Sequence, residues 1–147
     1  MMTLENLLRI GKLKPHAVDK VEIRRLLEAA ERALADARLE RLSSDTRLGL
    51  AYRAIMQVAL AAMLANGYRP ATSEPGHHQL LIQALPRTAG IPAERVRVLD
   101  AYRAARNLSD YRGAPVSDAV AEECGADAAS VLSEVRRWIA ANRPDLA

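Results

Sequence analysis

The sequence contains no phenylalanine, and aromatic residues of all kinds make up only 3% of the chain. Aliphatic side chains and methionine must therefore form the core, because 50% of the residues are hydrophobic. Leucine, alanine and methionine are strong helix formers, whereas strands are enriched in β-branched and aromatic residues. The composition therefore favours packed helices over sheets.

Disulfides, glycine-rich loops and a strong charge of one sign are also lacking. The single cysteine, Cys124, excludes an internal disulfide and fits a reducing compartment. The seven glycines are scattered, so no glycine-rich loop that cradles phosphate is present. The net charge is +3, from 21 basic and 18 acidic residues, and such a small excess does not by itself predict nucleic-acid binding.

No apolar run has the length that a membrane span requires. The longest, "VALAAMLA" at 58–65, is far shorter than the roughly 20 residues of a spanning helix. The opening residues contain no apolar stretch of signal-peptide length. We therefore expect a soluble cytoplasmic protein with no membrane partner, and a chain of 147 residues suits a single domain.

Apolar residues recur near the helical period along most of the chain, and no segment alternates with the period of a strand. An arm at 1–15 precedes a helical domain at 17–141. Short turns connect successive long helices, which makes them antiparallel neighbours. The expected fold is all-α, an up-and-down four-helix bundle with one short extra helix and an N-terminal arm. The first expected helix begins at Asp19. The others are expected over 45–66, 77–85 (ending at Pro86), 92–110 and 117–141.

The segment "AYRAARNLSDYRG" at 101–113 contains the densest group of polar side chains. On a helix of about 100° per residue, with Val98 at zero, Arg106 falls at about 80°, between Tyr102 and Leu99. Arg106 therefore lies within the apolar sector or on its edge, where an arginine is costly unless something pairs with it.

Two interpretations of Arg106 remain open at this point. In the first, Arg106 and Asp110, four residues apart, form an ordinary ion pair on the helix surface. In the second, Arg106, Asn107, Asp110 and Tyr111 line a cleft, with Arg103 on the adjoining polar side. Arginine and asparagine can hold phosphate oxygens there, and a tyrosine can stack on a base.

The motif "RNLSDY" at 106–111, late in the third long helix, resembles the HEPN superfamily. The resemblance covers about residues 17–141 and implies an all-α bundle that usually dimerises. Many HEPN proteins are ribonucleases of toxin–antitoxin, abortive-infection and CRISPR systems. Others lack activity and accompany small nucleotidyltransferases.

The active family motif is an arginine, a polar residue and then a histidine a few residues later. Arg106 and Asn107 match its start, but the expected histidine positions hold Tyr111, Arg112 and Gly113. A histidine with a pKa near 6.5 suits the proton transfers of RNA cleavage, whereas a tyrosine with a pKa near 10 does so poorly. We therefore expect a protein without efficient catalysis.

Three functions follow from these residues. The favoured one is a non-catalytic HEPN-like protein that binds a nucleotide, RNA or a partner nucleotidyltransferase, in a toxin–antitoxin or defence system. The alternatives are a metal-independent ribonuclease that uses Arg106 and Tyr111 without a histidine, and a structural scaffold for interactions. The expected binding residues are Arg103, Arg106, Asn107, Asp110 and Tyr111.

A homodimer is the expected assembly, because HEPN relatives usually dimerise and because the arm leucines and Tyr111 are candidate surface groups. We expect neither a cofactor nor a metal. His77 and His78 are adjacent, so on a helix they point about 100° apart and rarely share one ion. They are expected to be polar residues at a helix start, and Cys124 a small buried hydrophobe. The arm leucines are Leu4, Leu7 and Leu8.

Overall fold

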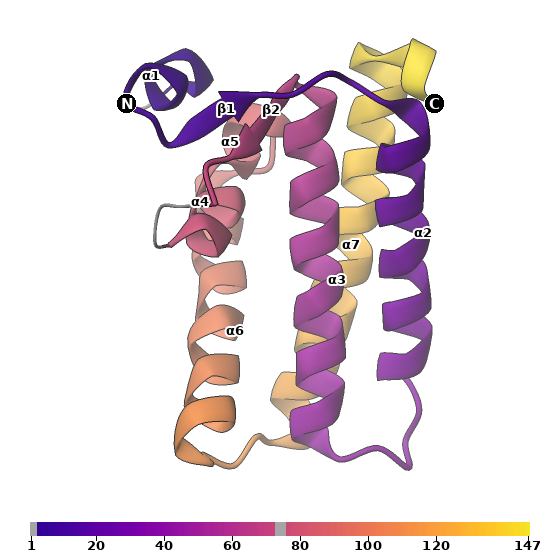
Figure 1. Ribbon diagram of the computed structural model, residues 1–147. Coiled ribbons are helices and arrows are strands. Elements are labelled where there is room, and N and C mark those ends of the chain that lie inside the picture. Colours follow the sequence, from indigo (N-terminus) through magenta and orange to yellow (C-terminus); the bar gives the residue numbers. More distant parts are fainter. Residues whose placement is uncertain (1–2, 73–75) are drawn as a thin grey trace.

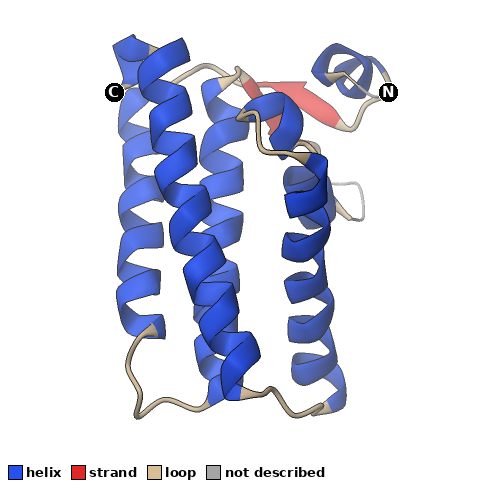
Figure 2. Cartoon of the chain, turned by 180° about the vertical axis from the view of Figure 1, so that it is seen from behind, coloured by secondary structure: helices blue, strands red, loops and turns tan. Residues whose placement is uncertain are grey.

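The computed structural model describes residues 3–72 and 76–147, and it confirms the all-α class (Figure 1). Two short strands accompany the helices at the end of the molecule where both termini lie (Figures 1 and 2). The elements are α1 (Leu4–Arg9), β1 (Leu13–Pro15), α2 (Lys20–Ala37), α3 (Ser44–Ala65), β2 (Tyr68–Pro70), α4 (His77–Gln83), α5 (Leu85–Thr88), α6 (Ala93–Arg112), α7 (Asp118–Asn142) and the 3-10 turn η1 (Pro144–Leu146).

Local capping signals position the helix starts as the sequence predicts. Asp19 caps α2, since its carboxylate accepts hydrogen bonds from the backbone N–H groups of Val21 and Glu22. Ser117 caps α7 in the same way. The Glu22 side chain does not return to the cap as a capping box requires; it contacts His16 instead, at 2.8 Å from the ring Nε2.

Helix α3 is the centre of the molecule and packs against α2, α7 and α6 (Figure 1). Its length and mean hydropathy of 1.6 would suffice for a membrane span, but 67% of that window is buried inside the protein. Alanines recur along α3, which lets neighbouring helices approach closely. This burial on several sides is that of a core helix and agrees with a soluble protein.

The chain contains a small antiparallel ribbon that the sequence pattern does not predict. Strands β1 and β2 pair in the register Leu13↔Pro70, Lys14↔Arg69 and Pro15↔Tyr68. Three residues per strand are too few to show an alternating pattern. The ribbon ties the arm to the bundle, because the side chain of Leu13 is buried.

Two further expectations need correction. The short helix was expected to end at Pro86, but α4 ends at Gln83 and Pro86 lies in the first turn of α5. A proline is tolerated there because the first N–H groups of a helix have no intrahelical partner. The arm leucines were candidate interface groups, but Leu4 and Leu7 are buried against the protein's own core.

Helix α6 buries only part of the apolar sector that the sequence predicts. On the helical wheel the expected sector also includes Val98 and, at about 280°, Leu108, but these two side chains are 46% and 54% exposed. Leu99 and Tyr102, which belong to the same expected sector, are buried as predicted, and Val96 is buried with them. Apolar residues occur on both sides of this helix, so periodicity alone does not show which side faces inward. Because Arg106 lies between Leu99 and Tyr102 on the helical wheel, the true orientation turns it toward the bundle.

A side-chain hydrogen bond joins α6 to α7. The hydroxyl of Tyr102 donates to Oδ2 of Asp127 at 2.5 Å. Burial, and then the bond to Asp127, raise the pKa of Tyr102, so the hydroxyl stays protonated and remains a donor. This bond helps to fix the orientation of α6.

We predict that Tyr102→Phe lowers the free energy of unfolding by about 1–2 kcal/mol, because a hydrogen bond to a carboxylate is lost while the ring stays buried. Tyr111→Phe is the matched control. Tyr111 is 77% exposed on the same helix, so removal of its hydroxyl should leave stability unchanged. Urea unfolding at neutral pH measures both variants. Equal stability of Tyr102→Phe and the wild type would show that the bond to Asp127 does not hold α6.

Candidate functional site

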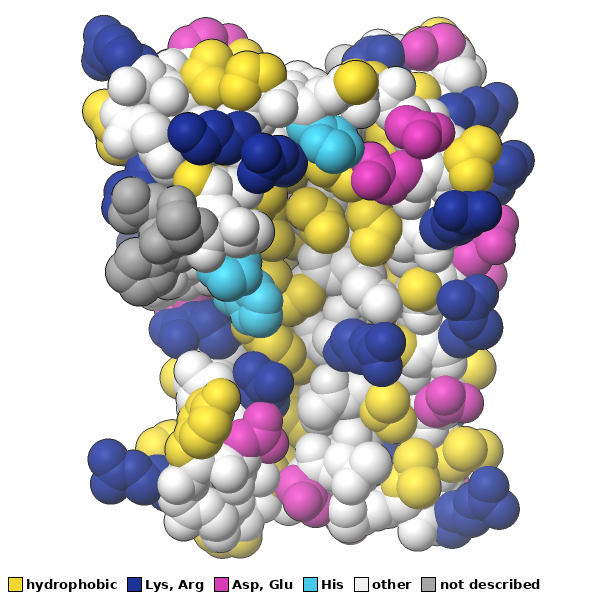
Figure 3. All heavy atoms as spheres, viewed as in Figure 1, with side chains coloured by type: hydrophobic (Ala, Val, Ile, Leu, Met, Phe, Trp, Pro, Cys, Tyr) yellow, Lys and Arg dark blue, Asp and Glu magenta, His cyan; other side chains and the backbone are white. Residues whose placement is uncertain are grey.

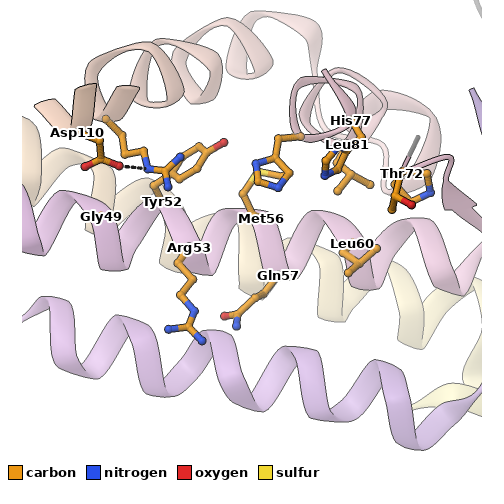
Figure 4. Close-up of a pocket in the computed structure, with 13 residues that line it drawn as sticks. Gly49, Tyr52, Arg53, Met56, Gln57, Leu60, Thr72, His77, Leu81 and Asp110 are labelled. Atoms are coloured by element: carbon orange, nitrogen blue, oxygen red, sulfur yellow. Dashed lines mark ion pairs between the residues drawn. The ribbon is translucent and has the colours of Figure 1, made fainter. Parts of the chain in front are cut away.

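An apolar pocket of about 530 Å³ lies between α3 and α6 and is bordered by α4. The space-filling view shows it as a furrow with hydrophobic side chains along its floor (Figure 3). The close-up shows Tyr52, Met56 and Leu60 along α3, with Leu81 of α4 nearby (Figure 4). The volume lies in the range of about 300–1,000 Å³ that small-molecule sites occupy.

The pocket exists because α3 and α6 do not fill the space between them with apolar side chains. Gly49 contributes no side chain, and a Cβ at this position would meet nothing within 4 Å. On the facing helix, the positions that border the pocket hold Arg106 and Asp110 instead of leucine or valine. Charged side chains at such a boundary keep their polar ends near water, which leaves the furrow open.

Arg106 is held between an ion pair and an aromatic ring. Its Nε lies 2.8 Å from Oδ2 of Asp110, and its guanidinium carbon lies 5.2 Å from the centroid of the Tyr52 ring. The side chain is 32% exposed. The ion pair foreseen in the first interpretation is therefore present, and the same arginine also borders the pocket of the second.

The contacts of Arg106 leave part of its guanidinium unused. Asp110 engages Nε, and Nη1 is 3.5 Å from Oδ1 of Asn107, which is a weak contact. Among residues 3–72 and 76–147, Nη2 has no hydrogen-bond partner. Asp110 and the Tyr52 ring therefore fix the orientation of the planar group while its terminal nitrogens stay available.

Tyr52 lies beneath the guanidinium and is almost fully buried, at 3% exposure. Its hydroxyl oxygen is buried with no hydrogen-bond partner among the described residues. Burial raises the pKa of Tyr52, and the positive charges of Arg106 and Arg103 oppose that shift. The neutral ring is thus a stable platform for a cation above it.

A second hollow, of about 240 Å³, adjoins the first and shares Tyr52 and Arg106 with it. Arg103 and Asn107 border it from α6. Arg103 is already paired, with Nε 2.7 Å from Oδ1 of Asp100 and Nη2 3.4 Å from Oδ2. Arg103 therefore adds positive potential to the hollow, while its own guanidinium is already paired with Asp100.

His77 and His78 border both hollows, which sequence reasoning did not foresee. They begin α4 as expected, and their rings meet edge to face with centroids 4.6 Å apart. Burial lowers the pKa of His78, and the neighbouring His77 and then Arg106 lower it further. No local signal in the sequence could have placed them beside Arg106, because only the packing of α4 against α6 does so.

The five residues expected to bind do not all lie together. Arg106 and Asp110 border the larger hollow, and Arg103, Arg106 and Asn107 border the smaller one. Tyr111 is 77% exposed and lies on a different side of α6.

Cys124 borders neither hollow. Cys124 is buried, and burial raises the pKa of its thiol to about 12, so the reactive thiolate is strongly disfavoured. Within the described part of the chain, no group of three or more histidine, cysteine, aspartate or glutamate residues is placed to hold a metal ion.

No family model matches the chain and no curated protein matches it, so the likeness to the HEPN superfamily rests on the motif at 106–111 and on the order of the helices.

We predict that the imidazole of His78 titrates below its ordinary pKa of 6.5 and that Arg106→Gln raises its midpoint, because a nearby positive charge is removed. NMR titration of the histidine ring protons measures this midpoint. Arg32→Gln, an exposed position on α2, is the control and should leave it unchanged. A midpoint at or above 6.5 would contradict the burial of His78, and a midpoint that Arg106→Gln does not change would contradict its proximity to Arg106.

The lowered pKa of His78 also sets a direction for stability against pH. The unfolded chain binds the proton more tightly than the folded protein does, so protonation favours unfolding. This contribution to stability is fully present above the ordinary pKa of 6.5 and falls as the pH drops through the folded pKa. His78→Gln should flatten that part of the stability profile, as measured by urea unfolding across mildly acidic pH.

Proposed function

We propose that this protein binds a nucleotide, free or within single-stranded RNA, in the pocket between α3 and α6, without cutting RNA efficiently. The observation that carries the proposal is the half-buried Arg106, which is oriented by Asp110 and Tyr52 and borders an open pocket with unused donors. Guanidinium groups held in this way bind phosphate oxygens through two parallel hydrogen bonds.

The surroundings of Arg106 favour an anion. Arg53, Arg103 and the two histidines border the same hollows, whereas Asp110 is the one acidic residue among the described lining. Asp110 is already engaged with Nε of Arg106. A bound phosphate would also favour the protonated form of His78, which adds a further charge to the contact.

The apolar part of the pocket suits the base of a nucleotide. Met56, Leu60 and Leu81 offer apolar surface next to the charged end. A thioether is polarizable and contacts aromatic rings favourably. The pocket thus combines a cationic end and an apolar floor, as a ligand with a phosphate and a flat ring system requires.

The same proposal includes a HEPN-like arrangement of the helical bundle. The long helices α2, α3, α6 and α7 run alternately in opposite directions in Figure 1. The motif that starts at Arg106 lies late in α6, the third of them. A HEPN-like protein without the motif histidine is expected to bind RNA or a nucleotide and not to cleave RNA efficiently. It is compatible with a nucleotidyltransferase partner and with a role in a toxin–antitoxin or defence system.

The test is calorimetric titration with AMP and with a short single-stranded RNA. Arg106→Ala should weaken binding by about 1–3 kcal/mol, because a charged hydrogen bond to phosphate is lost. Arg32→Ala, an exposed arginine on α2, is the control and should bind like the wild type. If Arg106→Ala binds normally and only loses stability, the arginine serves the fold alone and the protein is a scaffold.

One observation favours a second candidate, a metal-independent ribonuclease. His77 and His78 border the pocket beside Arg106, although the motif itself lacks a histidine. A neutral imidazole can take the proton of a 2′-hydroxyl while a guanidinium stabilises the charge that develops on the phosphate. RNA cleavage that His78→Gln abolishes would establish this candidate, whereas intact RNA after incubation with wild-type protein supports binding alone.

A further inference from the structure

Two cations lie directly opposite each other on the β ribbon. Lys14 of β1 pairs with Arg69 of β2 in the antiparallel register. Directly opposed residues of two paired strands project from the same face, and like charges in such a pair are destabilising. The other face of the ribbon is buried through Leu13 and Pro70, so Lys14 and Arg69 share the exposed face.

No ion pair offsets this repulsion among residues 3–72 and 76–147. Arg69 makes only a marginal contact, with Nη1 3.5 Å from the carbonyl oxygen of Pro70, and Lys14 is exposed. The carboxylate of Glu22 is engaged with His16, the residue after β1, at 2.8 Å from the ring Nε2. An anion between Lys14 and Arg69 would remove the repulsion between them, so the pair favours a negatively charged ligand.

The furrow between α3 and α6 ends at this ribbon. Figure 4 shows Thr72, which follows β2, beside Leu60 at one end of the pocket and Asp110 beside Tyr52 at the other. Tyr52 and Leu60 are about 12 Å apart along the axis of α3, at 1.5 Å per residue. Basic side chains lie over the ribbon at the end of the furrow (Figure 3). The apolar floor therefore has Arg106 at one end and the cation pair of the ribbon at the other.

We propose that the pocket takes a single-stranded RNA of more than one nucleotide, with one phosphate at Arg106 and another phosphate of the same strand at Lys14 and Arg69. The assignment rests on the proposed function and narrows its ligand from a nucleotide of either kind to an RNA strand. A free mononucleotide carries its phosphate at one end only, so it reaches one of the two cationic ends at a time. A strand repeats the phosphate along its length, so it reaches both ends together.

The strand that fits this furrow is unpaired. Met56, Leu60 and Leu81 offer apolar surface between the two cationic ends. The faces of bases reach such a surface in a single strand, whereas in a duplex they are stacked inside the helix. Double-stranded RNA should therefore bind more weakly than a single strand of the same sequence.

Calorimetric titration with AMP and with tetra-adenylate RNA tests the ribbon as part of the site. Lys14→Gln and Arg69→Gln should each weaken tetra-adenylate binding by roughly fivefold or more, because a phosphate contact is lost. Both variants should bind AMP like the wild type. Arg32→Gln, which removes an exposed charge from α2, is the control and should leave the binding of both ligands unchanged.

Salt dependence and a charge reversal distinguish a phosphate contact from a structural role. The slope of log affinity for tetra-adenylate against log salt should become shallower by about 0.7 for each cation removed, because each phosphate contact to a single strand releases counterions in that proportion. Lys14→Glu places a carboxylate opposite Arg69. It should therefore preserve or raise the resistance of the protein to urea while it weakens tetra-adenylate binding.

The results separate this ligand from the proposed function. If Arg106→Ala weakens the binding of AMP and tetra-adenylate while the Lys14 and Arg69 variants bind tetra-adenylate normally, the pocket holds a nucleotide and the extended RNA site is wrong. Equal affinity of the wild type for AMP and tetra-adenylate would also overturn the extended site. If Arg106→Ala changes the binding of neither ligand, the proposed function is wrong and the RNA site falls with it.

Discussion

The rotation of α6 about its own axis decides which of its side chains face the bundle and which face solvent. Leu99 and Tyr102 must be buried against the bundle, and the hydrogen bond from Tyr102 to Asp127 secures that orientation. The burial of these two side chains turns Arg106 inward, onto the ring of Tyr52, and leaves Leu108 facing solvent. This one orientation thus places Arg106 at the pocket on one side of α6 and leaves Val98 and Leu108 exposed on the other.

The pocket depends on a balance between desolvation and charge. Arg106 keeps its charge in a half-buried place because Asp110 and the face of Tyr52 replace part of its water. Burial and the neighbouring His77 and Arg106 favour the neutral form of His78. An anion in the pocket would reverse that preference, which couples ligand binding to proton uptake.

Local chemistry made much of the fold predictable, and tertiary packing made the rest unpredictable. The cap at Asp19 and the stop at Asn66 depend on neighbours in sequence, so they could be predicted. The inward side of α6 could not, because apolar residues occur on both of its sides. The helical wheel placed Arg106 in the apolar sector or on its edge, but that sector also included Val98 and Leu108, which are exposed. The histidines joined the site only through the packing of α4 against α6.

The most direct test of nucleotide binding at Arg106 follows the side-chain Nε–Hε signals of the arginines by NMR while AMP is added. Binding in the pocket between α3 and α6 predicts that the signal of Arg106 shifts in a saturable way, together with the ring protons of His78. The signal of Arg32 on α2 should stay in place. Saturable shifts confined to other arginines, or no shifts at all, would contradict a nucleotide site at Arg106.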